Sequence, residues 1–154
     1  MAQGSHQKGS IMTAPKLAST ADGDGDFMRG RFNKAKGFLE SAETLFTLGS
    51  NDSGVLMPSS PQADSFVDLC VDAGIAAADA ICVKKTGRYS SSTDHSAAIA
   101  LLQDATGRST AKHLGTLVQV KNKAAYSAKS VDASDIHSAG EAARALVAHA
   151  EDII

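Results

Sequence analysis

The stretch FVDLCVDAGIAAADAICV, residues 66–83, decides the fold. Its apolar residues fall on nearly every side of a helix, and its only charged residues are three aspartates. A helix that is apolar almost all round belongs inside a bundle, with other helices packed around it. Small residues dominate AGIAAADA, residues 73–80, where another backbone can approach closely. The stretch therefore predicts a central helix over about residues 61–85.

The aspartates of this helix share one face, because Asp64, Asp68, Asp72 and Asp79 follow one another at steps of four and seven. A metal-binding carboxylate bundle would also need partners such as Glu-x-x-His motifs, and the sequence contains none. We interpret the row as a solvated face and expect no metal and no cofactor. The two cysteines lie in the apolar stretch and form no CxxC pair, so we expect buried, reduced thiols.

Amphipathic helices are predicted on both sides of this central helix. Apolar residues at steps of three and four predict helices over about 26–48, 94–105 and 111–126, and a last helix that begins after Asp132 and Asp135. Ser60 with Pro61, Thr93, and Ser109 or Thr110 are the expected helix starts, and Asp132 with Asp135 is an expected capping pair. No strand is predicted. The fold class is all-α, an up-down bundle of about five helices.

Residues 1–25 are rich in Gly, Ser, Ala and Thr, and we predict a disordered tail before a single domain over 26–154. The net charge of −2 demands neither nucleic acid nor an acidic membrane surface. No stretch has the ~20 apolar residues of a membrane span, and the N-terminus has no signal-peptide core. We expect a cytoplasmic protein that does not enter membranes.

Polar residues in two places are candidates for binding. In GRYSSSTDHS, residues 87–96, Arg88 and His95 are separated by six residues, and either could contact RNA. The alternative is a turn between helices, with a solvated Arg88 and with His95 as an anchoring residue. Lys121, Lys123 and Lys129 lie on the fourth helix and its exit, where they form either a basic groove or an ordinary lysine surface.

The chain resembles the HEPN family of helical-bundle proteins over about residues 27–153. The matching features, in chain order, are RFNKAKGFLESAETLF, AGIAAADAICV, the histidine that opens DHSAAIALL, and KNKAAYSAKSVDASDIHSAGEAARALVAHA. The resemblance implies a homodimer of helical bundles that binds or cleaves RNA without a metal. It also implies a toxin–antitoxin or phage-defence setting with an antitoxin as partner. The alternative is a catalytically silent dimeric module that binds a partner protein.

The family's cleavage motif pairs an Arg with a His, and its place in this chain is KNKAAY, residues 121–126. By resemblance, Lys121 stands at the Arg position, Asn122 is its polar neighbour, and Tyr126 stands at the His position. A tyrosine with a pKa near ~10 is a poor general base at neutral pH. The motif therefore keeps phosphate-binding chemistry at Lys121 and is weakened for cleavage.

Overall fold

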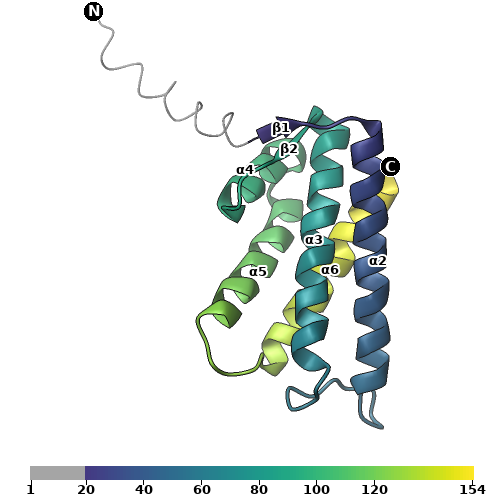
Figure 1. The fold of residues 1–154 in the computed structure, drawn as a ribbon, viewed down its shortest axis with the longest axis vertical. Coiled ribbons are helices and arrows are strands. Elements are labelled where there is room, and N and C mark those ends of the chain that lie inside the picture. Colours follow the sequence, from purple (N-terminus) through teal and green to yellow (C-terminus); the bar gives the residue numbers. More distant parts are fainter. Residues whose placement is uncertain (1–19) are drawn as a thin grey trace, which may run out of the picture.

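The computed structural model describes residues 20–154, and within them five helices form an up-down bundle (Figure 1). The predicted all-α fold is confirmed. The helices are α2 (Gly25–Gly49), α3 (Ala63–Thr86), α4 (His95–Thr106), α5 (Arg108–Ala125) and α6 (Ala133–Ile153). The helices α2, α3, α5 and α6 alternate in direction, while the shorter α4 lies at one edge of the bundle (Figure 1).

The helix α3 is the centre of the bundle, as its sequence predicts. Fourteen of its 24 residues are buried, and it packs against all four of the other helices. Gly74 marks the tightest crossing, because a Cβ atom there would overlap Leu117 of α5 and lie 3.3 Å from Leu146 of α6. The leucines are fully buried. A glycine at this position therefore lets three helices meet closely.

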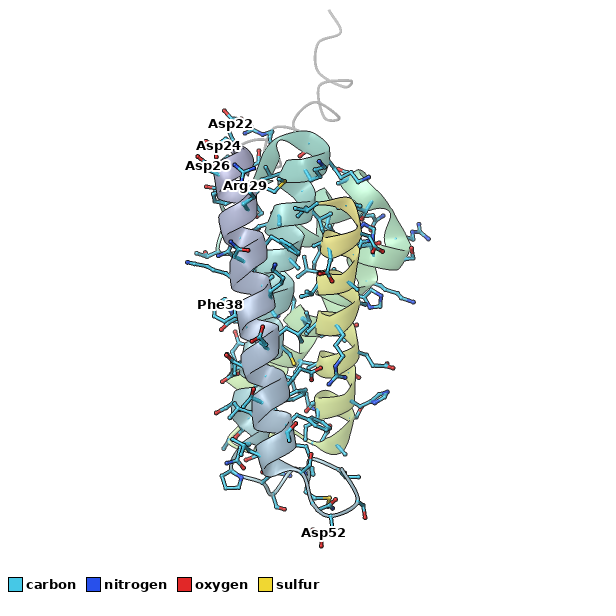
Figure 2. The ribbon with its side chains drawn as sticks, turned by 90° about the vertical axis from the view of Figure 1, so that its right-hand side faces the viewer. Asp22, Asp24, Asp26, Arg29, Phe38 and Asp52 are labelled. Atoms are coloured by element: carbon cyan, nitrogen blue, oxygen red, sulfur yellow. The ribbon has the colours of Figure 1, made fainter. Side chains whose placement is uncertain are left out.

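Two ion pairs join α2 to its neighbours. Arg31 binds Asp79 of α3 at 3.0 Å, and Glu43 accepts two hydrogen bonds from Arg144 of α6, at 2.7 and 3.0 Å. At its start, α2 is capped by Asp24, whose carboxylate accepts a 2.8 Å hydrogen bond from the amide of Phe27. Figure 2 shows Asp22, Asp24 and Asp26 together at this end, where the helix dipole favours negative charge.

A two-stranded sheet departs from the sequence expectation of no strand. Strands β1 (Thr20–Asp22) and β2 (Arg88–Ser90) pair antiparallel, with Thr20 opposite Ser90. The predicted disordered tail over residues 1–25 is wrong for residues 20–25, which form β1, the cap of α2 and its first residue, and residues 1–19 lie outside the described residues. Part of GRYSSST is likewise a strand rather than a turn. The pairing continues beyond the strands, because the amide of Gly23 donates a 2.9 Å hydrogen bond to the carbonyl of Gly87 and Phe27 stacks on Tyr89.

The helix starts differ from expectation in detail. The predicted capping pair is confirmed, because Asp132 and Asp135 form a reciprocal capping box at the start of α6. Asp94, not Thr93, caps α4. The α3 helix starts after Gln62, with Ser60 and Pro61 in the preceding turn, and α5 follows Gly107 without a side-chain cap. Within residues 20–154, none of the helices combines the length and the apolar character that crossing a bilayer requires.

Candidate functional site

His95 and Lys121, two of the predicted site residues, lie together in the structure. Helices α4 and α5 form a tight hairpin whose single connecting residue, Gly107, has a φ of 103°, a conformation that favours glycine. This hairpin carries the end of α5 back toward the start of α4. The Nζ atom of Lys121 consequently lies 3.4 Å from Nε2 of His95. The sequence separation between these residues is 26.

The position of His95 favours its neutral form. Partial burial lowers the pKa of His95, the positive charge of Lys121 lowers it further, and Asp94 acts in the opposite direction. A neutral imidazole has one nitrogen that accepts a hydrogen bond, and Nε2 can accept one from the ammonium group. At neutral pH the pair therefore carries a single positive charge, and in more acidic solution it carries two.

A carboxylate on α3 adds negative charge near this pair. Burial raises the pKa of Asp68, its neighbours Asp72 and Asp64 raise it further, and the charge of Lys121 lowers it. Lys121 therefore interacts electrostatically with an acidic row as well as with His95. The negative charge of these aspartates weakens the attraction of the site for an anion. An anion bound there must therefore be held by direct contacts with Lys121 and His95.

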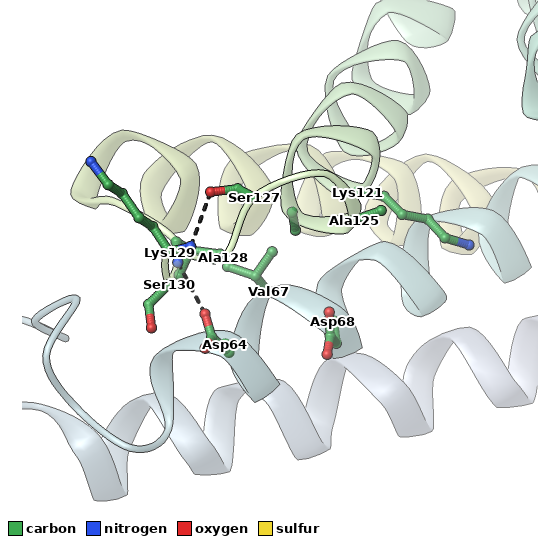
Figure 3. Close-up of a pocket in the computed structure, with 11 residues that line it drawn as sticks. Asp64, Val67, Asp68, Lys121, Ala125, Ser127, Ala128, Lys129 and Ser130 are labelled. Carbon is green, nitrogen blue, oxygen red and sulfur yellow. Dashed lines mark hydrogen bonds between the residues drawn. The ribbon is translucent and has the colours of Figure 1, made fainter.

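A cavity of about 470 Å³ lies next to the pair, between the start of α3 and the connection from α5 to α6 (Figure 3). Asp64 anchors this connection by accepting a 3.0 Å hydrogen bond from the amide of Val131. Lys121 and Lys129 both line the cavity, and Figure 3 shows their side chains on opposite sides of it. The cavity walls carry charges of both signs, so the cavity has no clear preference for an anion or a cation.

The other residues of the KNKAAY motif do not join this pair. Tyr126 is 92% exposed and is not among the residues that line the cavity, and Asn122 is exposed on α5. Lys123 contacts the α6 capping box instead, at 3.0 Å from Asp132 and 3.2 Å from Asp135. Hydrogen bonds to these carboxylates raise the pKa of Lys123. Its contacts therefore support the start of α6.

Arg88 also has contacts that the sequence did not indicate. Its guanidinium group donates to the hydroxyl of Thr20 at 2.8 Å, to the carbonyl of Thr20 at 3.1 Å, and to Asp22 at 2.5 Å. These bonds hold β1 against β2. No local sequence pattern indicates these bonds, because the partners lie 66 and 68 residues apart.

The sequence also does not indicate that Asp68 interacts electrostatically with Lys121. The interacting residues lie on α3 and α5, so only the packing of these helices reveals it. Among residues 20–154, no group of three or more His, Cys, Asp or Glu side chains is placed to hold a metal ion. Comparison of the chain with family models, curated proteins and solved structures gave no match.

Proposed function

We propose that this protein binds RNA, with Lys121 and His95 contacting a backbone phosphate, as expected of a HEPN-like bundle. The observation that carries the proposal is the 3.4 Å approach of Nζ to Nε2. An ammonium group has three N–H donors, so Lys121 can contact a phosphate oxygen while it remains beside the imidazole. His95 is the first residue of α4, where the helix dipole also favours a negative group.

The charge of the chain limits how such binding would work. With a net charge of −2, the protein cannot rely on broad attraction to a polyanion. A site with one lysine and one histidine neutralises roughly one phosphate, so we expect weak binding with a shallow dependence on salt. We expect the bound RNA to be single-stranded, because the phosphates of a single strand can reach the site without the protein having to fit the groove of a duplex.

Cleavage is a finer proposal that transfers the base role from Tyr126 to His95. When a ribose 2′-hydroxyl replaces Lys121 as the hydrogen-bond donor to Nε2, a neutral His95 can take its proton as that oxygen attacks the adjacent phosphorus. The phosphorus–5′-oxygen bond then breaks, which leaves a 2′,3′-cyclic phosphate, and the departing 5′-oxygen takes up a proton from water. Lys121 stabilises the charge that develops on the phosphate oxygens.

Fluorescence anisotropy with a short labelled single-stranded RNA tests the binding. We expect Lys121→Ala and His95→Ala each to weaken binding severalfold. The matched control is Lys34→Ala, which removes an exposed lysine of α2. Equal effects of Lys34→Ala and Lys121→Ala, or no binding by the wild type, would contradict the proposal.

The same RNA, incubated in EDTA and resolved on a denaturing gel, tests the cleavage. We expect cyclic-phosphate products from the wild type, none from His95→Ala, and unchanged cleavage by Tyr126→Phe. Binding without cleavage would remove only the finer proposal.

A second candidate function is a module that binds a partner protein. Four of the five large apolar side chains that are exposed in residues 20–154, Leu48, Val55, Met57 and Tyr126, lie in or beside two connections at one end of the bundle (Figure 1). A contiguous exposed apolar patch marks an interaction site, and Leu48, Val55 and Met57 lie in or beside the same connection. A complex that Met57→Asp disrupts, in a protein that binds no RNA, would favour this function.

A further inference from the structure

The cavity between α3 and the connection from α5 to α6 carries charged side chains of both signs. Asp64 and Asp68 line it from α3, and Lys121 and Lys129 line it from α5 and the connection (Figure 3). The formal charges of these side chains cancel, so the cavity does not select a simple ion. Its volume of about 470 Å³ lies within the range of small-molecule sites, which is about 300–1,000 Å³. The cavity can therefore hold a small molecule that itself carries both charges.

The opposite charges at this cavity are not paired directly with one another. Asp64 accepts a 3.0 Å hydrogen bond from the amide of Val131, so its negative charge is partly satisfied. Within residues 20–154, Asp68 accepts no hydrogen bond and belongs to no ion pair, although its carboxylate interacts electrostatically with Lys121. These two side chains are close enough to attract each other but too far apart for direct contact. A ligand with two opposite charges can bridge them.

The surroundings of Asp68 favour a bound cation. Burial raises the pKa of Asp68, and the negative charges of Asp72 and Asp64, one helical turn away on either side, raise it further. An ammonium group beside Asp68 would relieve this repulsion. Lys121 has N–H donors left for a carboxylate, because its contact with His95 uses only one of its three. The cavity thus presents an acceptor for an ammonium group and a donor for a carboxylate.

Another part of the cavity wall is apolar and built from small residues. Ala124, Ala125 and Ala128 are exposed, and they line the cavity together with the buried Val67. Methyl groups can pack against an aliphatic chain but cannot form hydrogen bonds with a polar one. A ligand that fits this wall has an aliphatic part beside its two charges.

We propose that this cavity binds a free aliphatic amino acid, with its ammonium group on Asp68, its carboxylate on Lys121 and its side chain against the alanines. Both charges of the ligand are needed, because Asp68 repels a lone carboxylate and Lys121 repels a lone ammonium group. The inference does not rest on RNA binding. The two ligands share Lys121, however, so the amino acid should compete with RNA.

Isothermal titration calorimetry without RNA tests the proposal on the full-length chain. We expect L-leucine to bind at millimolar concentrations. Isocaproate, which is leucine without its ammonium group, and isoamylamine, which is leucine without its carboxylate, should each bind about tenfold more weakly. Asp68→Asn and Lys121→Ala should each weaken leucine binding by a similar factor. The matched control is Asp72→Asn, which removes an exposed aspartate of α3 outside the cavity and should change the affinity far less.

The analogues separate a direct contact from a loss of structure. Asp68→Asn should bind isocaproate more tightly than the wild type does, because the carboxylate is no longer repelled. Its circular dichroism should be unchanged, since Asp68 is exposed. The same variant should tighten RNA binding if Lys121 contacts a phosphate, so leucine and RNA should respond to it in opposite directions.

A wild type that binds neither L-leucine nor L-alanine would overturn the proposal, whatever the RNA assay shows. Equal affinities for leucine and isocaproate would also overturn it, because Asp68 would then have no part in binding. Unchanged leucine binding by Asp68→Asn would place the ligand elsewhere. Leucine binding as described in a protein that binds no RNA would support this inference and remove only the proposed function.

Discussion

Replacing Gly74 by alanine tests whether α3, α5 and α6 meet as described. Alanine in place of glycine within an open part of a helix normally stabilises a protein by about 0.5–1 kcal/mol, through helix propensity and unfolded-state entropy. At Gly74 the added Cβ would overlap Cδ1 of Leu117 and lie 3.3 Å from Leu146. Both leucines are fully buried, so neither can move away into solvent.

Overpacking of a well-packed core costs about 1–3 kcal/mol. Subtraction of the gain of about 0.5–1 kcal/mol leaves Gly74→Ala less stable than the wild type by roughly 0–2.5 kcal/mol, with a midpoint of about 1 kcal/mol. Gly37→Ala is the matched control, because a Cβ there meets nothing within 4 Å on the exposed face of α2. We expect this control to be stabilised by about 0.5–1 kcal/mol. The two substitutions are chemically identical and should have opposite signs.

Urea unfolding followed by circular dichroism at the helix band gives both free energies. If the slope of the unfolding free energy against urea concentration is the same in both variants and in the wild type, all three expose the same amount of surface on unfolding. If Gly74→Ala is as stable as Gly37→Ala, the close crossing of the three helices is refuted. If Gly37→Ala is destabilised instead, the exposed position of that α2 face is wrong.

Three further predictions concern charged residues. Burial raises the pKa of Asp79 to about 6, so its contribution to stability is largest below its usual value of 3.8 and is lost as the pH rises through 6. In urea unfolding across this range, the wild type should lose up to about 3 kcal/mol relative to Asp79→Asn, and parallel curves would contradict this. Lys123→Ala should lower the melting temperature, because its contact with Asp135 is lost, and leave RNA affinity unchanged; a loss of affinity at constant stability would contradict the structural role. Asp68→Asn removes a negative charge near Lys121, so it should tighten RNA binding in the anisotropy assay, and weaker binding would count against the site.

The sequence predicts the helices well because their signals are local. The apolar composition of residues 66–83 identifies the central helix, and the spacing of Asp132 and Asp135 identifies the start of α6. The sheet could not be predicted in the same way. Its strands have three residues each, and the bonds of Arg88 join segments more than 60 residues apart.

The candidate site was predictable only in part. His95 and Lys121 stood out as polar residues near helix ends, but their contact depends on the one-residue turn at Gly107. A longer connection would have placed them differently. Lys123 resembled its neighbour in sequence, yet the fold directs it to the α6 cap, and Tyr126 lies exposed beyond the end of α5. The polar residues of the KNKAAY motif therefore lie in different surroundings, because their side chains leave α5 in different directions.

The dependence of RNA affinity on pH tests the central claim most directly. Because the pKa of His95 is lowered from 6.5, the wild type should gain a positive charge at the site only in mildly acidic solution. A surface charge pair contributes up to about 1 kcal/mol, which corresponds to roughly fivefold in affinity. We predict that the wild type binds single-stranded RNA about fivefold more tightly when the pH falls from neutral to mildly acidic, and that His95→Ala loses this gain. The same gain in His95→Ala, or no gain in the wild type, would contradict the assignment of the site to Lys121 and His95.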